Sequence, residues 1–274
     1  MAKDLRTFLA QCERELPGEV IHITKEVNPA NYDVTAIIKH LGAQKKFPII
    51  IFDKPLNLNG KVGPIKLTMN CEISQGKTQI ALGMPKHATR PQMAEKCLEM
   101  EEHRVPPTIV SKREAPVKEN TMVGDKVDLF EIPIMRHHEM DGGPYIVLST
   151  VTKDKKSGIY NCSYHRMEVK SKNSTALYAS PRHLWKIYRD YETRNEPMPV
   201  ATVMGHHPAF HMGACYSGPF EVSEYDVIGG YLGEPLRLVP SETFGDDLLI
   251  PADAEVVIEG VLIPNKRVVE GPFG

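Results

Sequence analysis

The fold of this chain is decided by the stretch PYIVLSTVTKDKKSGIYNCSYHRMEV at residues 144–169. Its first nine residues are mostly apolar or β-branched, the polar run KDKKSG follows at 153–158, and a second extended run occupies 159–169. Two extended runs on either side of a short polar turn predict an antiparallel β-hairpin. The second strand carries NCSYHR at 161–166, which contains no aliphatic residue, so we expect this strand to face either solvent or a ligand.

The chain that follows the hairpin is predicted to be mostly β-structure. Two short helices are expected, one over 183–191 and one that Ser223 caps at its start. Several strands with two short helices are typical of a barrel-like β domain. The predicted strands are 199–204, 236–239, 247–250 and 255–263.

The chain that precedes the hairpin has an α/β pattern. Helices are predicted over 4–14, from an Asp33 cap to Gly42, and near 91–101, with strands at 20–23 and 47–52. Residues 106–126 contain three prolines and many charges, which predicts a linker or crossover. We therefore expect an α+β protein with an α/β domain at residues 1–113 and a barrel-like domain at 114–274.

The composition of the 274 residues is that of a soluble globular protein, with 41% hydrophobic and 25% charged residues. A formal net charge of -2 gives no support to a protein that binds nucleic acid or anionic membranes. No run of about 18 apolar residues predicts a transmembrane helix. The five cysteines form no C-x-x-C pair, so free thiols and a reducing, cytoplasmic location are expected.

The sequence allows a divalent metal site made of three side chains. Asn161, His183 and Glu224 offer an amide oxygen, an imidazole and a carboxylate, a mixed set that suits Mn²⁺ or Mg²⁺ better than structural zinc. His183 and Glu224 also lie at predicted helix starts, where anions are favoured. Arg166 can clamp a carboxylate through its guanidinium fork, and Glu270 can transfer a proton.

Two histidine-rich stretches have simpler explanations. His137 and His138 precede Asp141, but adjacent side chains in an extended segment point to opposite faces, so a single metal would use only one of them. A polar loop is the more economical interpretation of this stretch. The run GHHP at 205–208, followed by His211, is expected to be a solvated loop.

Four ordered motifs resemble the UbiD family of decarboxylases. They are E-x-DGGPYI at 139–146, NCSYHR at 161–166, GEPL at 233–236, and the segment from EG at 259–260 to EGPFG at 270–274. The resemblance runs over the whole chain and is strongest after about residue 130.

This resemblance implies a non-oxidative, reversible decarboxylase of aromatic or acrylic acids that uses prenylated FMN, made by a partner flavin prenyltransferase. It implies a split β-barrel like that of flavin reductases, a metal, commonly Mn²⁺, and a nearby K⁺. It also implies that Asn161, His183 and Glu224 serve the metal, and that Arg166 and Glu270 are catalytic. The cofactor would lie against these residues: Asn161, Ser163, Tyr164, Arg166, Arg182, His183, Ala214, Cys215, Tyr216 and Glu224.

The resemblance breaks off at the end of the chain. In the family a second Glu, the proton donor, follows the GPFG turn, whereas this sequence stops at Gly274. We therefore expect a fragment, a truncated frame or half of a split protein, without the C-terminal part that would complete the site and a homo-oligomer. Alone, it is predicted to decarboxylate weakly or not at all.

Two other functions stay open from the residues. The chain can be a flavin-binding module without catalysis, since the second Glu is absent. It can also be an unrelated divalent-metal hydrolase built on His137, His138 and Asp141.

Overall fold

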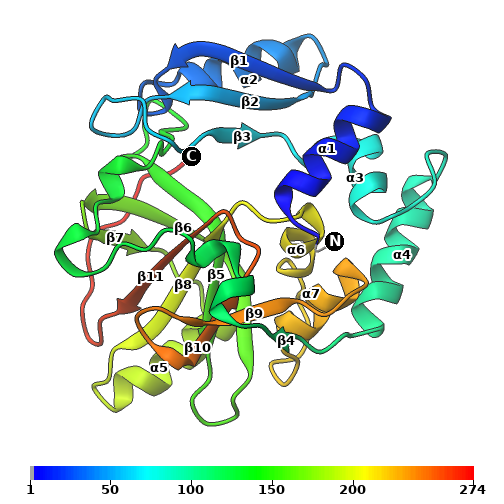
Figure 1. Ribbon diagram of the computed structural model, residues 1–274. Coiled ribbons are helices and arrows are strands. Elements are labelled where there is room, and N and C mark those ends of the chain that lie inside the picture. Colours follow the sequence, from blue (N-terminus) through cyan, green and yellow to red (C-terminus); the bar gives the residue numbers. More distant parts are fainter. Residues whose placement is uncertain (1–2) are drawn as a thin grey trace.

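A computed structural model describes residues 3–274 and contains three β-sheets (Figure 1). The first sheet has the order β1-β2-β3, in which β1 and β2 are parallel and β2 and β3 antiparallel. The apolar run of β2 is buried on both faces, as predicted, because helices α1 and α2 and neighbouring loops cover it. The elements of this part are α1 (Leu5–Glu15), β1 (Val20–Val27), α2 (Asp33–Ala43), β2 (Ile49–Pro55), β3 (Leu67–Met69), α3 (Gln75–Ala81) and α4 (Arg90–Glu102).

The predicted hairpin is the centre of a five-stranded antiparallel sheet with the order β11-β8-β5-β6-β7. The sheet curls into half of a barrel in the lower left of Figure 1. Strands β5 and β6 pair without a register shift from Tyr145 opposite Glu168 to Lys153 opposite Tyr160. The strands are β5 (Tyr145–Lys153), β6 (Tyr160–Ser171), β7 (Ser174–Leu177), β8 (Met198–Met204) and β11 (Val256–Leu262).

A third, small sheet and three helices complete the chain. Its order is β10-β9-β4, and the large apolar core lies among β5, this sheet and helices α6 and α7. Tyr225 is fully buried there, stacks on Tyr160 at 4.8 Å and donates to the carbonyl of Leu249. The elements are β4 (Thr108–Ile109), α5 (His183–Thr193), α6 (Pro208–Gly213), α7 (Glu224–Leu232), β9 (Arg237–Ser241) and β10 (Gly245–Pro251).

Several local predictions differ from the structure. Asp33 is the first residue of α2 and not its cap, because Tyr32 takes the cap position and the Asp33 carboxylate accepts the backbone N–H of Asn28. Ser223 precedes α7 as predicted, but its side chain makes no capping hydrogen bond. Residues 106–126 are irregular apart from three 3₁₀ turns and β4, and the domain boundary at 113/114 stays a prediction.

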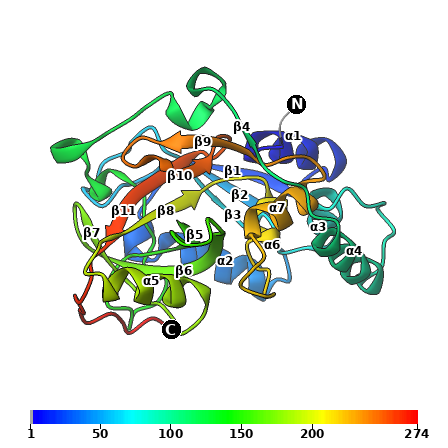
Figure 2. The same cartoon turned by 90° about the horizontal axis from the view of Figure 1, so that it is seen from below.

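Helix α4 lies directly against α7, as Figures 1 and 2 show from two directions. The backbone N–H of Val105, just after α4, donates to the carbonyl of Asp226 at 3.0 Å. Side chains on Gly229 and Gly230 would overlap the carbonyl oxygens of Val105 and Met100. The absence of side chains at these two glycines therefore lets the backbones meet. None of the helices in residues 3–274 combines the length and apolar character that a membrane crossing needs.

The Gly229→Ala variant is expected to lose about 1–3 kcal/mol of unfolding free energy through overpacking. The gain of up to about 1 kcal/mol in helix propensity will not offset the overlap with Val105. Urea denaturation gives the free energies. Gly260→Ala in β11 is the control, because nothing lies within 4 Å of its added Cβ. Equal stabilities of Gly229→Ala and the parent would contradict this packing argument.

Candidate active site

The structure brings Arg166 of β6 and Glu270 of the C-terminal turn together. Arg166 Nη2 donates to Glu270 Oε2 at 2.8 Å, and the Glu270 side chain is only 10% exposed. The guanidinium carbon lies 4.6 Å from the ring centroid of Tyr178 and 5.5 Å from that of Phe273. The hydrogen bond to Glu270 raises the pKa of Arg166, so the guanidinium stays charged.

Two polar atoms of this pair are buried without a hydrogen-bond partner among residues 3–274. They are Arg166 Nε and Glu270 Oε1. Buried polar atoms without a partner are rare and costly, and they mark places where a ligand completes the hydrogen bonding. The pair therefore has one donor and one acceptor to offer to a bound molecule.

Asn161, His183 and Glu224 also converge, although they lie on β6, α5 and α7. Asn161 Nδ2 donates to Glu224 Oε1 at 3.2 Å, and His183 Nδ1 lies 3.4 Å from the same oxygen. The backbone N–H of Cys162 donates to Glu224 Oε2 at 3.3 Å. Both helices begin at these side chains, so their N-terminal dipoles point into the cluster.

The chemistry of this cluster fits a divalent cation. Glu224 is 2% exposed, burial raises its pKa, and His183 is its sole ion-pair partner in the described part of the chain. A buried carboxylate that lacks a permanent cation is stabilised by a dication. An amide oxygen, an imidazole and a carboxylate then supply three ligands, once the amide of Asn161 turns its oxygen toward the cation.

The other predicted cofactor contacts surround this cluster. Ser163 Oγ donates to Asn161 Oδ1 at 3.1 Å, so both side chains share one face of β6, as predicted. Arg182, which precedes α5, donates to Ser217 Oγ at 3.2 Å and so joins the start of α5 to the segment after α6. In that segment Ala214 is buried, Cys215 is exposed and Tyr216 is half-buried.

Strand β6 has an open edge along the predicted site. Strand β7 pairs with β6 only between Met167 and Ser171, so residues 161–165 have no neighbouring strand on that side. Asn161 and Arg166 point to opposite faces of the strand, because their positions differ by five, an odd number. A ligand at the open edge can reach side chains of both faces.

The loop before α3 contributes a carboxyl group that the sequence analysis did not single out. Glu72 is exposed to solvent, yet protein surrounds its carboxyl group closely enough to raise its pKa to about 7. Its charge helps to raise the pKa of Tyr164 and of Cys215, so it lies near both predicted cofactor contacts. Tyr178 and Phe273 were also missed, because no sequence pattern links them to Arg166.

The cluster of His137, His138 and Asp141 is a structural turn. Asp141 Oδ2 accepts the backbone N–H groups of His137 and His138 at 3.0 and 2.8 Å, and Oδ1 accepts that of Gly274 at 3.2 Å. The Asp141 carboxylate is therefore already satisfied. Residues 3–274 contain no group of three His, Cys, Asp or Glu side chains arranged to hold a metal.

The prediction of a solvated loop at 205–211 is wrong. His206, His207 and His211 are all buried, because α6 packs into the large core. Burial lowers the pKa of His207 and of His211 to about 4, so both are neutral at neutral pH. Aromatic contacts replace solvent: His206 stacks on Phe210, and His207 meets Phe8 edge-on.

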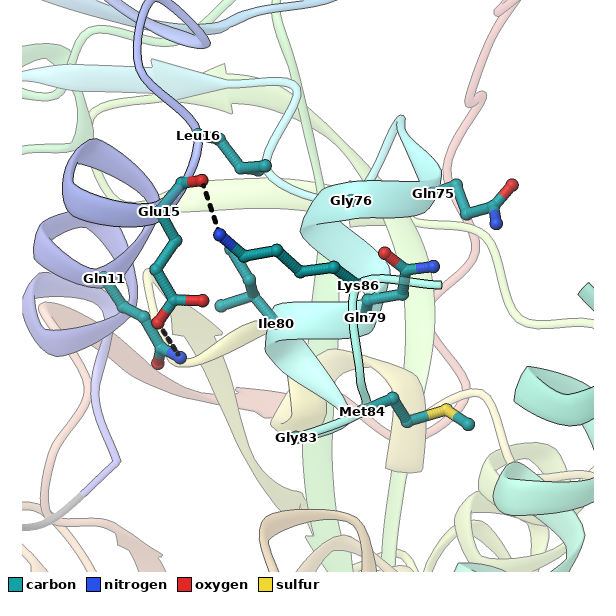
Figure 3. Close-up of a pocket in the computed structure, with 10 residues that line it drawn as sticks. All are labelled: Gln11, Glu15, Leu16, Gln75, Gly76, Gln79, Ile80, Gly83, Met84 and Lys86. Atoms are coloured by element: carbon teal, nitrogen blue, oxygen red, sulfur yellow. Dashed lines mark hydrogen bonds between the residues drawn. The ribbon is translucent and has the colours of Figure 1, made fainter. Parts of the chain in front are cut away.

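A hollow between α1 and α3, shown in Figure 3, contains none of the predicted site residues. Lys86 Nζ donates to the carbonyl of Glu15 at 3.3 Å, and Gln11 donates to the Glu15 carboxylate at 3.0 Å. The side-chain amides of Gln75 and Gln79 donate to the carbonyl of Ala88 at 2.8 and 2.7 Å, so the polar groups of the hollow already have partners within the protein. The hollow is lined by Gln11, Glu15, Leu16, Gln75, Gly76, Gln79, Ile80, Gly83, Met84 and Lys86.

Comparison with known proteins adds a family match. Residues 108–274 match the family model described as UbiD, 3-octaprenyl-4-hydroxybenzoate carboxy-lyase Rift-related domain. A phenolic acid decarboxylase of Sedimentibacter hydroxybenzoicus is 33% identical over 99% of this chain and 57% of its own length. A phenolic acid decarboxylase of Bacillus subtilis is 32% identical over the same shares. The chain thus spans just over half of the length of these relatives.

Solved structures of the same class superpose closely. An evolved dimeric form of the UbiD-class enzyme HmfF from Pelotomaculum thermopropionicum, in complex with prFMN, matches with a TM-score of 0.89 and 31% identity. The superposition covers 100% of this chain and 60% of the chain of that enzyme. The closed form of vanillic acid decarboxylase from Sedimentibacter hydroxybenzoicus has a TM-score of 0.88 and 30% identity, over 100% and 58% of the two chains.

Proposed function

The chain belongs to the UbiD family, and on this premise we propose that it carries the part of a carboxy-lyase that binds prenylated FMN (prFMN), together with the catalytic residues Arg166 and Glu270. The reaction is the non-oxidative, reversible decarboxylation of an aromatic or α,β-unsaturated acid. Phenolic acids are the first substrates to test, because the relatives are named for them. The proposed architecture for the curled sheet is a split β-barrel like that of flavin reductases.

One observation carries this proposal: the half-buried Arg166–Glu270 pair keeps one buried donor and one buried acceptor without a partner in the described part of the chain. An arginine beside a carboxylate is ordinarily fully paired, and such a pair would be inert. Here Arg166 Nε is free to hold the carboxylate of a substrate while Nη2 still holds Glu270. The pair can therefore bind an acid and keep a proton-transfer group next to it.

The residues of the chain have separate tasks in this reaction. Arg166 binds and orients the substrate carboxylate, which leaves as CO₂ when its C–C bond breaks. When bound, prFMN supplies the sink for the electron pair of that bond. Glu270 moves the proton that the substrate carbon takes up in place of CO₂. The rings of Tyr178 and Phe273 lie beside the guanidinium and support its orientation.

The cofactor phosphate would be held through Mn²⁺ or Mg²⁺ on Asn161, His183 and Glu224. A dication held by these residues would offset more of the negative charge of the phosphate and of the buried carboxylate than a single lysine can. Ser163, Tyr164, Arg182 and the segment 214–216 would contact the cofactor. We include K⁺ near 214–216, a flavin prenyltransferase as the source of prFMN, a homo-oligomer and a cytoplasmic location in the proposal.

A second candidate function is a flavin-binding module without turnover. The share of the relatives' length that the chain spans, 57%, favours testing this candidate directly. The protein is co-expressed with a flavin prenyltransferase, and its absorbance is recorded. Bound flavin without CO₂ release and without deuterium exchange on hydroxybenzoic or cinnamic acids would support the module.

The metal site is tested by titrating the metal-free protein with Mn²⁺ and monitoring binding by electron paramagnetic resonance. We expect Asn161→Ala and Glu224→Gln each to weaken Mn²⁺ binding by about 100-fold or more, because each variant removes a proposed metal ligand. Loss of a group that only orients a ligand already costs about 10–100-fold in metal affinity. His137→Ala is the control and should bind Mn²⁺ like the parent. The reverse pattern would favour the hydrolase alternative.

The role of Arg166 is tested with the variant Arg166→Ala in the complete gene product. Turnover is expected to fall by about 100-fold or more, because the substrate carboxylate loses its orienting charge. Absorbance should still report bound flavin, since the metal site is untouched. Arg113→Ala, at an exposed position, is the control. Retained turnover in Arg166→Ala would refute this assignment.

A further inference from the structure

Glu168 is a buried carboxylate that the proposed chemistry leaves without a task. It is 3% exposed and lies two residues after Arg166 on β6, so both side chains share a face of the strand. Burial opposes its ionisation, but Lys170 and the backbone N–H of Gly271 hold the pKa of Glu168 below its ordinary value. Lys170 Nζ lies 2.6 Å from Glu168 Oε1. Glu168 is therefore a fixed charge inside the protein.

The other oxygen of Glu168 faces the turn that follows Glu270. Oε2 accepts the backbone N–H of Gly271 at 3.1 Å and the hydroxyl of Tyr145 at 3.3 Å. The Tyr145 hydroxyl also lies 3.4 Å from the carbonyl oxygen of Pro272, and its ring centroid is 4.4 Å from that of Phe273. Burial and the neighbouring carboxylates raise the pKa of Tyr145, so its hydroxyl stays a donor. Glu168 and Tyr145 together contact three successive residues of the turn.

Gly142 also holds the turn, next to Glu168. The backbone N–H of Gly142 donates to the carbonyl of Pro272 at 2.8 Å. A Cβ on Gly142 would lie 2.8 Å from the carbonyl oxygen of Gly271 and 3.0 Å from Glu168 Oε1. Real Cβ atoms do not approach a backbone oxygen so closely, so position 142 requires glycine. Gly142 and Glu168 thus both hold the turn.

We propose that Glu168 is the positioning residue for Glu270. Its hydrogen bond fixes the peptide group that joins Glu270 to Gly271, and this fixes the direction in which the Glu270 side chain leaves the backbone. Glu270 Oε2 then meets Arg166, and Oε1 stays free for a proton. A misplacement of about 1 Å in such a group can cost about 100-fold in rate. The catalytic consequence rests on the proposed function, whereas the effect on the turn does not.

The test compares Glu168→Ala with the conservative Glu168→Gln. Amide hydrogen exchange at Gly271, read by NMR, reports the turn without any cofactor or substrate. In Glu168→Ala we expect exchange to accelerate by about tenfold or more, because the acceptor is lost. In the enzyme loaded with prFMN, kcat should fall by about tenfold or more while KM changes less than about twofold. Glu168→Gln keeps an acceptor oxygen, so the slow amide exchange of Gly271 and most of kcat should be retained.

Two further variants keep the test decisive. Glu259→Gln is the matched control, since the Glu259 carboxylate also accepts backbone N–H groups outside the site, those of Glu242 and Thr243. It should leave Gly271 exchange and kcat unchanged. Gly142→Ala should displace the turn while the Glu168 carboxylate remains, and it replaces Glu168→Ala if that variant does not fold.

The outcomes separate this inference from the proposed function. Unchanged Gly271 exchange in folded Glu168→Ala or Gly142→Ala overturns the positioning role. Faster exchange with unchanged kcat overturns it as well. If the complete gene product, loaded with prFMN, releases no CO₂ from any acid, the proposed function fails, and the exchange result still decides whether Glu168 holds the turn.

Discussion

The pairing of β5 with β6 is the constraint on which the rest of the structure depends. Its continuous register places Tyr145 opposite Glu168, and the alternation of β6 sets Asn161 and Arg166 on opposite faces. Two other elements then bring carboxylates to β6. Helix α7 brings Glu224 to Asn161, and the C-terminal turn brings Glu270 to Arg166. A shift of one residue in this register would exchange the two faces and dismantle both clusters at once.

The proposed site combines two carboxylates that the protein treats in opposite ways. Burial raises the pKa of Glu224. Its side-chain partners are the amide of Asn161 and the imidazole of His183, so a bound cation would stabilise its charged form. Lys170 and a backbone N–H keep Glu168 ionised despite its burial. One carboxylate thus suits a metal and the other suits a structural task, and the difference lies in the charges that surround them.

Most elements could be predicted from the sequence, and the errors have physical causes. The hairpin and the helix over 183–191 follow from periodicity, which the tertiary structure leaves intact. Asp33 was assigned as a cap, but Tyr32 adopts a left-handed conformation and takes that position. The sequence predicts His206 and His211 in solvent, because the segment 205–211 contains three histidines and a stretch so polar usually forms a surface loop. Packing of α6 into the core decides otherwise, and no local pattern records it.

The sequence by itself determined the longer strands but not β3, β4 or β7. It also determined the resemblance to the family and the donor types at Asn161, His183, Glu224, Arg166 and Glu270. Only the tertiary structure decided which of these side chains meet, and that Glu168, Tyr145 and Gly142 hold the turn beside Glu270. The physical reason is that donor chemistry belongs to single residues and periodicity to short segments. Contacts between residues more than 100 positions apart, such as Arg166 with Glu270, arise only when the whole chain packs.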